Sequence, residues 1–530
     1  MSEPIKSTTH PPIRSAAEIW IGVALFLGTV LSRIPFRSQM LYHWDSVNFA
    51  YAMQRFDVTA EQPQPPGYIV YVWLCRLVDL LFHDPQATMV WISIVSSGLA
   101  VVAIYMLGRA MFDLRTGLVG ALFLATSPLF WFYGEIALPH TADTFLVIIS
   151  MWLLWEAMQG RTWATVLAAV SLAAAGGVRQ QTPVFLGLAA LYATIGFLRR
   201  VGWVHGLRWG ALAVTVFGLL CAVWFFPLVD SAGGLAPYFQ TLGAFSERYD
   251  VTTSLFLGAG WFGLSRNLRK LGMYTAYGWG VALVPLALYV LRRVSRRRID
   301  GIRWEPVLLI LSWMLPGLSF YTAVHMGQQG LVFVFLPALL LFSAAGLTRL
   351  LLARHRWLIA AAVALMVVNI GIFCLAPEYP VGGDRLRLLT RATLVKSDRY
   401  YGDRFEAIAS NFAPESMAIL AGNWRHVEYY LPGYPSLHFD IGAKWEQNEG
   451  RPIDASQETI ATPTELGLQL DDRGYATIVI FDPHLMTFNR NPTPAQELPL
   501  EHGGSLEYLV LTEDQAFRYG DGSLGIEVSQ

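Results

Sequence analysis

The chain has 530 residues, of which 54% are hydrophobic and 15% are charged, with a net charge of −1. Soluble domains usually carry about 25% charged residues, so the composition excludes an ordinary soluble protein. The net charge hides an asymmetry, because residues 1–376 carry 26 Lys and Arg against 16 Asp and Glu, whereas residues 377–530 carry 12 against 23.

Apolar runs of a length that crosses a bilayer recur along residues 1–376. The first run follows a polar N-terminal stretch without a small-residue cleavage pattern, so we expect it to be a retained helix. By this length criterion we predict about eleven transmembrane helices. They cover residues 19–36, 88–108, 116–134, 143–158, 162–178, 183–198, 208–228, 274–291, 305–324, 330–348 and 357–376.

The basic residues of the short loops orient these helices. With a cytoplasmic N-terminus, the inner segments hold 17 Lys and Arg, and the outer segments before residue 377 hold 8. The opposite orientation would invert this positive-inside bias. We therefore predict a multi-pass plasma-membrane protein with a transmembrane domain at 1–376 and an extracytoplasmic soluble domain at 377–530. Nothing in the sequence points to a nucleic-acid partner.

The first outer loop, residues 37–87, contains a shorter apolar stretch. Residues 68–82 number about 15, too few to span a bilayer, and include Arg76 and Asp79. We expect a helix that lies at the membrane interface, with a second one at 46–56. Beyond residue 377, alternating apolar runs at 417–420, 477–481 and 506–511 predict strands, and hence a small α/β domain.

Acidic residues stand at the outer ends of the predicted helices. Asp45 follows the first span, where it is either a functional acid or the cap of the helix that starts near Ser46. Glu135, His140 and Asp143 lie between the third and fourth spans. Carboxylate and imidazole groups form an acid–base or metal-holding set, although their spacing matches no standard metal motif. The alternative is a group of polar residues exposed at the interface.

Basic and amide residues also gather on the outer side. Arg179 ends the fifth span, where it either grips a phosphate with its planar fork or extends to the lipid headgroups. His325 and Gln328 lie in a glycine-containing turn between the ninth and tenth spans. A basic cluster in the loop 229–273 suits a phosphate headgroup or simply anionic lipid; its members are Arg266, Arg269 and Lys270.

No P-loop, dinucleotide fingerprint, zincin motif or nucleophile elbow is present, and the three cysteines are far apart in apolar surroundings. The order of the outer motifs resembles that of the GT-C superfamily of integral-membrane glycosyltransferases, in particular the protein O-mannosyltransferase and lipid A aminoarabinose transferase type. The segments that carry the resemblance are Asp45, Phe49–Ala52, Pro65–Tyr68, Leu124–Phe130 with Asp143, Gly176–Pro183 and His325–Gly330.

The resemblance implies a GT-C-like helical domain that transfers a sugar from a polyprenyl-phosphate donor to a lipid, glycan or protein acceptor, with inversion at the anomeric carbon. It implies Asp45 as the general base and Asp143 as a second acid, with Glu135 or His140 as alternatives for the second role. Arg179 is the first choice for the donor phosphate. The further choices for substrate binding are His325, Gln328, Arg266, Arg269, Lys270 and Tyr68.

The chain departs from the family where Ser46, not an acid, follows Asp45, and where the second acid stands later than usual. These departures leave open which second acid acts and whether a divalent cation takes part; no cofactor is otherwise implied. Two other classes remain open, a multi-pass transporter or lipid flippase and a non-catalytic glycan-binding protein. Against the transporter, the sequence contains no internal repeat, and its acids lie in outer loops, not at span centres.

Overall fold

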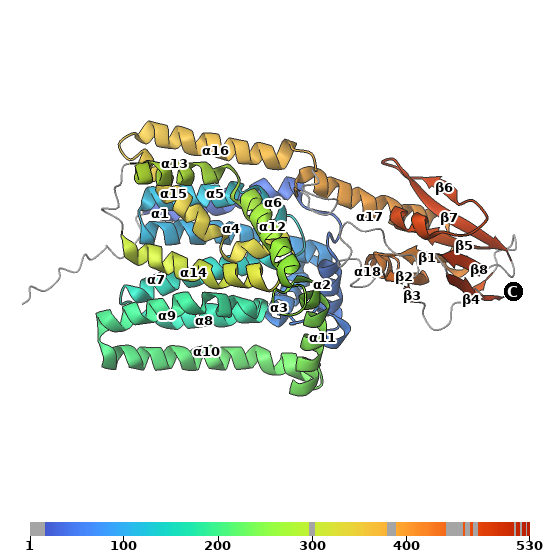
Figure 1. Cartoon of the computed structure of the whole chain (residues 1–530), viewed down its shortest axis with the longest axis horizontal. Coiled ribbons are helices and arrows are strands. Elements are labelled where there is room, and N and C mark those ends of the chain that lie inside the picture. Colours follow the sequence, from blue (N-terminus) through green and yellow to red (C-terminus); the bar gives the residue numbers. More distant parts are fainter. Residues whose placement is uncertain are drawn as a thin grey trace, which may run out of the picture.

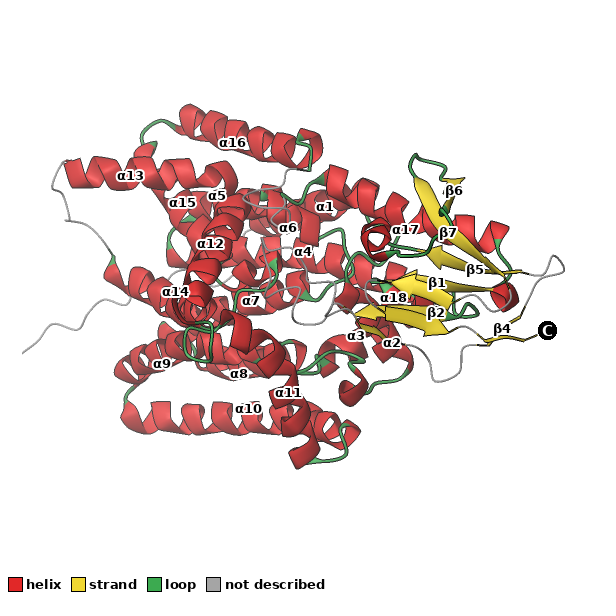
Figure 2. Ribbon diagram, turned by 45° about the vertical axis from the view of Figure 1, so that its right-hand side comes forward, coloured by secondary structure: helices red, strands yellow, loops and turns green. Residues whose placement is uncertain are grey.

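The computed structural model of the chain describes residues 16–295, 303–378, 388–440, 459–461, 467–469, 475–512, 516–519, 522–525 and 527–529. A block of helices from Ala16 to Leu375 is followed by a smaller C-terminal domain with a β-sheet, which lies at one end of the block (Figures 1 and 2). The fold class expected from the sequence is therefore confirmed.

Most helices of the block run roughly parallel to one another (Figure 1). Within the described residues, eight segments are long and apolar enough to cross a membrane: Ala16–Phe36, which contains α1 (Ala16–Arg33), α4 (Pro85–Met111), α7 (His140–Met158), α9 (Gln181–Val201), α10 (Trp203–Ser231), Gly260–Ser295, α14 (Trp304–Ala323) and α16 (His355–Leu375). Three shorter apolar helices lie at the other expected positions: α5 (Leu114–Thr126), α8 (Thr162–Val178) and α15 (Leu336–Leu350). The chain is a multi-pass membrane protein, and the count of eleven spans stays a prediction.

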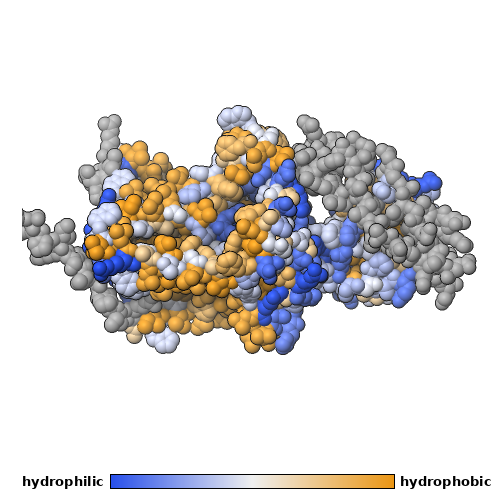
Figure 3. Space-filling model, turned by 90° about the horizontal axis from the view of Figure 1, so that it is seen from below, coloured by the Kyte–Doolittle hydropathy of each residue, from blue (hydrophilic) through white to orange (hydrophobic). Residues whose placement is uncertain are grey.

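The surface of the block has the character of a lipid-facing surface. On the face that Figure 3 shows, hydrophobic residues cover the flank of the block, and hydrophilic residues gather at its two ends. On α10, Val214 is 72% exposed and Leu219 is 64% exposed. Side chains of this kind are stable at the surface of a helix that faces hydrocarbon, since lipid tails are as apolar as they are.

Two predicted spans are interrupted. The span expected at 116–134 divides into α5 and α6 (Pro128–Tyr133), because Pro128 cannot continue the hydrogen bonding of α5. The span expected at 274–291 divides into α12 (Gly260–Trp279) and α13 (Leu283–Ser295) at Gly280. Gly280 has a φ of 55°, and an added Cβ would lie 2.5 Å from Oδ1 of Asn369, so only glycine fits at this break.

The loop 37–87 carries the two expected helices, α2 (Trp44–Gln54) and α3 (Ile69–Phe82). The segment 229–273, expected to be a loop between two spans, is mostly helical. This segment forms α11 (Leu235–Thr253) and the first half of α12, and α11 runs across the end of the block (Figure 1). The basic cluster is consequently on a helix, where Arg266 and Lys270, four residues apart, share a face.

The C-terminal domain begins with α17 (Arg391–Asn411) and has a six-stranded sheet of order β3-β2-β1-β5-β7-β6. β2, β1 and β5 are parallel, and β3, β7 and β6 are antiparallel to their neighbours. The strands are β1 (Met417–Ala421), β2 (Ser436–Asp440), β3 (Thr459–Ala461), β5 (Tyr475–Ile480), β6 (Gln496–Pro499) and β7 (Ser505–Thr512), with α18 (Trp424–Tyr430) between β1 and β2. The α/β character predicted for this domain is confirmed.

The C-terminal domain holds the segment that leads to Asp45. Asp398 of α17 accepts hydrogen bonds from Ser38 Oγ at 2.7 Å and from the backbone N–H groups of residues 39 and 40 at 3.0 and 3.1 Å. The Tyr430 hydroxyl accepts from the N–H of Leu41 at 2.9 Å, and His426 Nε2 lies 3.0 Å from the Leu41 carbonyl. Residues 38–41 are therefore fixed along their length just before α2 begins.

Candidate active site

Asp45 lies in the first turn of α2, after His43, whose Nδ1 accepts a hydrogen bond from the Asp45 N–H. The Asp45 carboxylate accepts a hydrogen bond through Oδ2 from Nε2 of Gln328 at 2.6 Å. Its side chain is 22% exposed, so it is neither in bulk water nor sealed in the core. The carboxylate is thus oriented by a neutral amide and stays accessible.

Asp143 lies in the first turn of α7 and is buried. Its Oδ1 accepts a hydrogen bond from the Thr182 hydroxyl at 2.7 Å, and its Oδ2 lies 3.9 Å from Nη1 of Arg179. Arg179 is the C-cap of α8, and Thr182 lies in the first turn of α9. The two acids therefore have different surroundings, with an amide donor for Asp45 and a hydroxyl and a cation for Asp143.

Arg179 is the C-cap of α8, and its side chain is 12% exposed. It is not extended to the protein surface, so of the two roles weighed for it, the contact with lipid headgroups has no support in its position. The Tyr68 hydroxyl lies within electrostatic range of Arg179, Asp45 and Asp143, and burial raises its pKa. Tyr68 thus marks the space that the two acids and the arginine share.

His325 lies between α14 and the 3₁₀ helix η4 (Gln329–Val334). Its Nδ1 lies 3.0 Å from the Thr253 hydroxyl, and its ring packs against Tyr249. Burial, together with the positive charges of Lys270, Arg266 and Arg179, lowers the pKa of His325 to about 4. Three cations from two places in the fold, α12 and the end of α8, therefore lie within electrostatic range of the His325 imidazole.

Asn267 of α12 ties this turn in place. Its Nδ2 donates to the carbonyl of Thr253 at 3.0 Å and to that of Thr322 at 3.2 Å, and its Oδ1 accepts from the N–H of Met326 at 3.2 Å. The same helix presents Arg266, which is buried, and Lys270 near His325, whereas Arg269 is exposed. Of the three basic residues predicted together, two are near His325.

His140 begins α7 and packs against the turn that carries Gln328. Its ring lies 4.8 Å from that of Tyr133, and an added Cβ at Gly330 would lie 2.4 Å from its Cδ2. Only glycine permits this approach of the backbone to the ring. His140 therefore connects the turn that orients Asp45 to the helix that carries Asp143.

Glu135 is buried, and its charged neighbour differs from that of Asp143. Arg33 is the charged residue within its electrostatic range, and Arg33 itself lies over the Trp131 ring at 4.1 Å. Burial raises the pKa of Glu135 well above its ordinary value. The structure thus places Glu135 beside Arg33, whereas Asp143 is the acid that shares surroundings with Tyr68 and Arg179.

Sequence reasoning assigned no role to several side chains of this region. Thr182 holds Asp143, Asn267 holds the His325 turn, and Thr253 contacts the imidazole. Gln180 Nε2 and the Tyr238 hydroxyl both donate to the carbonyl of Pro66, at 3.1 and 3.0 Å, which secures the loop before Tyr68. Only Thr182 carried a signal, since it lies three residues after Arg179, about one helical turn away.

Residues 63–226 match the family described as dolichyl-phosphate-mannose-protein mannosyltransferase. The crystal structure of ArnT from Cupriavidus metallidurans bound to undecaprenyl phosphate is similar with a TM-score of 0.58 and 14% identity, over 94% of this chain and 98% of that chain. ArnT in the apo state gives 0.57 and 16%, over the same shares of the two chains.

The oligosaccharyltransferase of Archaeoglobus fulgidus in complex with Zn and sulfate is similar at 13% identity, over 78% of this chain and 62% of that chain, with a TM-score of 0.47. No curated protein sequence matches the chain. The fold expected from the order of the sequence motifs is confirmed by the similarity to ArnT over almost the whole chain: this protein has the fold of the GT-C integral-membrane glycosyltransferases.

Proposed function

We propose that the protein is a glycosyltransferase that moves a sugar from a polyprenyl-phosphate donor to an acceptor hydroxyl. The observation that carries the proposal is the arrangement of Arg179, Lys270 and Arg266 around His325, close to two carboxylates, in a chain with the fold of ArnT. A phosphate that bears a lipid and a sugar needs cations at the membrane edge, and the acceptor needs a base.

An apolar groove between α9 and α14 supplies a place for the lipid tail. It has a volume of about 550 Å³, and Leu191 and Leu315, both 57% exposed, are among the side chains that line it. α9 begins directly after Arg179, and α14 ends just before His325. A polyprenyl chain lying in this groove would place its phosphate at the cationic cluster.

Asp45 is the general base of the proposed reaction. Its carboxylate takes the proton from the acceptor oxygen as that oxygen attacks the anomeric carbon, and the bond to the phosphate breaks on the opposite face. The product has inverted configuration and requires no covalent enzyme intermediate. Arg179 and Lys270 stabilise the charge that develops on the leaving phosphate, because they stand where that charge appears.

Asp143 has a positioning role in this scheme. It faces the Arg179 guanidinium and accepts from Thr182, so it directs Arg179 toward the phosphate. We place the reaction on the extracytoplasmic face of the plasma membrane, with a cytoplasmic N-terminus, because the basic residues of the short loops favour that orientation. The acceptor is a lipid, glycan or protein.

The residues of this site do not suit a divalent cation. Mg²⁺ and Ca²⁺ are held by carboxylates that point oxygen atoms at one position. Asp143 faces a guanidinium that would repel the metal, and Asp45 accepts from an amide N–H. We therefore propose transfer without a metal at these two acids, and activity that survives prolonged treatment with EDTA. Activity lost with EDTA and restored by Mg²⁺ or Mn²⁺ would overturn this point.

The test of the proposed function is incubation of the purified protein, in membranes of defined lipid, with labelled polyprenyl-phosphate monosaccharides and membrane extracts as acceptors. We expect label to move from the lipid into a stable product, and its anomeric configuration to be opposite to that of the donor. Thr194→Ala, on the far half of α9, is the control variant. Absence of label in any product, with the donor intact and bound, would contradict the proposal.

A further inference from the structure

A second pocket lies where the helical block meets the C-terminal domain. It has a volume of about 710 Å³ and is formed by the end of α16, by α17 and by the hairpin between β6 and β7. Figure 1 shows the end of α16 next to the start of α17. Because α16 is long and apolar enough to span a membrane, the pocket lies at the level of the lipid headgroups.

The two walls of this pocket differ in chemistry. The wall from α16 is apolar and includes Leu375, which is 83% exposed. The wall from α17 carries Arg391, Val395 and Arg399, which share one helix face because they are four residues apart. Both arginines are exposed, and in the part of the chain that the structure describes no carboxylate pairs with either. An apolar wall that faces two guanidinium groups not neutralised by a carboxylate of the described residues suits an amphipathic anion.

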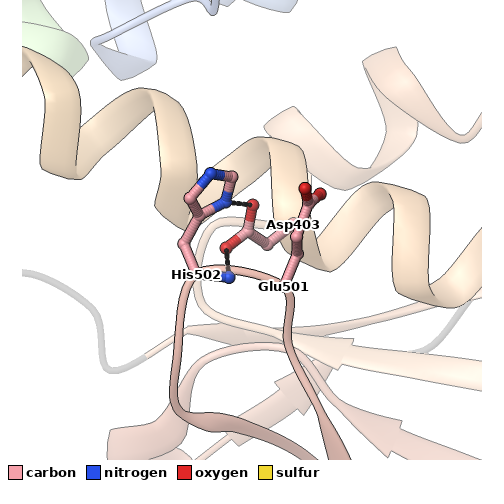
Figure 4. Close-up of side chains that lie close together, drawn as sticks. All are labelled: Asp403, Glu501 and His502. Atoms are coloured by element: carbon pink, nitrogen blue, oxygen red, sulfur yellow. Dashed lines mark hydrogen bonds and ion pairs between the residues drawn. The ribbon is translucent and has the colours of Figure 1, made fainter.

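The rim of the pocket is fixed by contacts of its own. Lys396 pairs with Glu378 at 2.9 Å, and Asp403 accepts from the backbone N–H of His502 at 3.2 Å, with Nδ1 of the same histidine 2.9 Å from the carboxylate (Figure 4). These contacts hold the β6–β7 hairpin against α17. Because Asp403 is already bound by His502, we regard the cluster that it forms with Glu501 as part of the rim.

The cationic residues of α17 lie on a different face from Asp398, which holds the helical block. Asp398 holds residues 38–40 of the helical block, whereas Arg391 and Arg399 line the pocket. The guanidinium of Arg391 also lies 5.4 Å from the ring centroid of Phe36 in the helical block, whereas Arg399 makes none of the contacts that attach the C-terminal domain described above. Exposed arginines beside an apolar helix end are complementary to a ligand that has both a negative charge and a hydrocarbon part.

We propose that this pocket binds the phosphate headgroup of an anionic membrane lipid, at a site separate from Asp45. Arg391 and Arg399 contact the phosphate, and the acyl chains lie against Leu375 and Val395. Each Lys or Arg near an anionic lipid surface contributes about 1 kcal/mol, so removal of one arginine weakens binding about fivefold.

The test uses the full chain in nanodiscs and measures its binding of a short-chain fluorescent phosphatidylglycerol, with phosphatidylcholine as the comparison lipid. We expect preference for phosphatidylglycerol in the wild type. Arg391→Gln with Arg399→Gln should weaken binding about 25-fold, two independent losses of about fivefold each. The double Arg→Lys variant should retain most of it. Arg518→Gln, an exposed arginine elsewhere in the C-terminal domain, is the matched control.

Three results would overturn the proposal. The first is equal binding of the two lipids by the wild type, and the second is unchanged binding by the double Gln variant. The third is full competition by soluble glycerol phosphate, which would show that the pocket binds a free phosphate. The rate of sugar transfer by the double Gln variant distinguishes a failure of this lipid site from a failure of the proposed function. We expect its transfer rate with saturating donor to equal that of the wild type, and loss of transfer with retained lipid binding would place the arginines in the transfer site.

Discussion

Gln328 donates a hydrogen bond to Asp45 over 2.6 Å, although 283 residues separate the two in the chain. The bond joins the first turn of α2 to the turn after α14. It fixes one carboxylate oxygen of Asp45 without neutralising its charge, which is the condition that a general base needs. Two variants separate the charge of Asp45 from its orientation.

Asp45→Asn removes the base and keeps the shape of the side chain. We expect sugar transfer to fall by about 100- to 10,000-fold, with donor binding unchanged. Gln328→Ala leaves the base but frees its orientation, so we expect a loss of about tenfold. The measurement is the single-turnover rate with saturating donor. Asn48→Ala, on the buried side of the same helix, reports on effects of folding alone. Near-normal transfer by Asp45→Asn would remove Asp45 from the mechanism.

Arg179→Ala should lower transfer by about 100-fold, because the leaving phosphate loses the cation that stands closest to the second acid. Arg179→Lys should recover only part of this loss, since an ammonium group lacks the planar fork. Thr182→Val should have a smaller effect than Arg179→Ala, because it releases only one oxygen of Asp143. The donor dependence of the rate distinguishes binding from chemistry. An Arg179→Ala enzyme with wild-type kinetics would make Arg179 purely structural.

Lys270→Ala and Arg269→Ala provide a matched pair on α12. Lys270 lies within electrostatic range of His325, whereas Arg269 is exposed on the same helix. We expect Lys270→Ala to raise the KM for the donor about five- to tenfold, and Arg269→Ala to change it less than twofold. Equal effects of the two substitutions would mean that the helix attracts the donor only through its overall charge.

His325 and His426 should make the protein sensitive to acid. Burial lowers the pKa of each to about 4, below the ordinary value of 6.5. Between pH 6.5 and 4 the unfolded chain therefore binds more protons than the folded one. Stability is complete above pH 6.5 and is lost as the pH falls toward 4. We expect the Tm to fall over this interval, and to fall less in His325→Gln.

The control for this experiment is His205→Gln, because His205 is exposed at the surface of α10. A parallel fall of the Tm in wild type and in His325→Gln would show that His325 does not contribute. The scan should be run at one heating rate throughout, since membrane proteins commonly unfold irreversibly.

Much of the fold could be predicted because a membrane imposes a length and an apolar composition on each helix. Those constraints act locally, so α4, α9 and α16 lie where the hydropathy of their own residues places them. α11 and the first half of α12 were missed because they are too polar for this criterion. Their helices depend on contacts with distant segments, such as the bonds from Asn267 to Thr253 and Thr322.

For the site, position along the chain indicated the candidates but not their partners. Asp45, Asp143 and Arg179 could be predicted because each is a charged residue at the end of an apolar helix. A charged residue near the membrane is a candidate for function. The choice between Asp143 and Glu135 depends on which side of the α6–α7 turn each faces, and eight residues of sequence do not encode that. Asn267 became recognisable only through the atoms that it contacts, whereas the spacing of Thr182 from Arg179 was visible in the sequence.

The fastening of residues 38–41 by Asp398, Tyr430 and His426 has a consequence for engineering. The segment that precedes Asp45 is part of the helical block in sequence, but its position is fixed by hydrogen bonds to the C-terminal domain. A chimera that exchanges the C-terminal domain for that of a relative must therefore exchange residues 38–41 with it. Otherwise the transplanted α17 and α18 would face residues 38–41 of a different protein. The hydrogen bonds that fix the turn before α2 would then be lost.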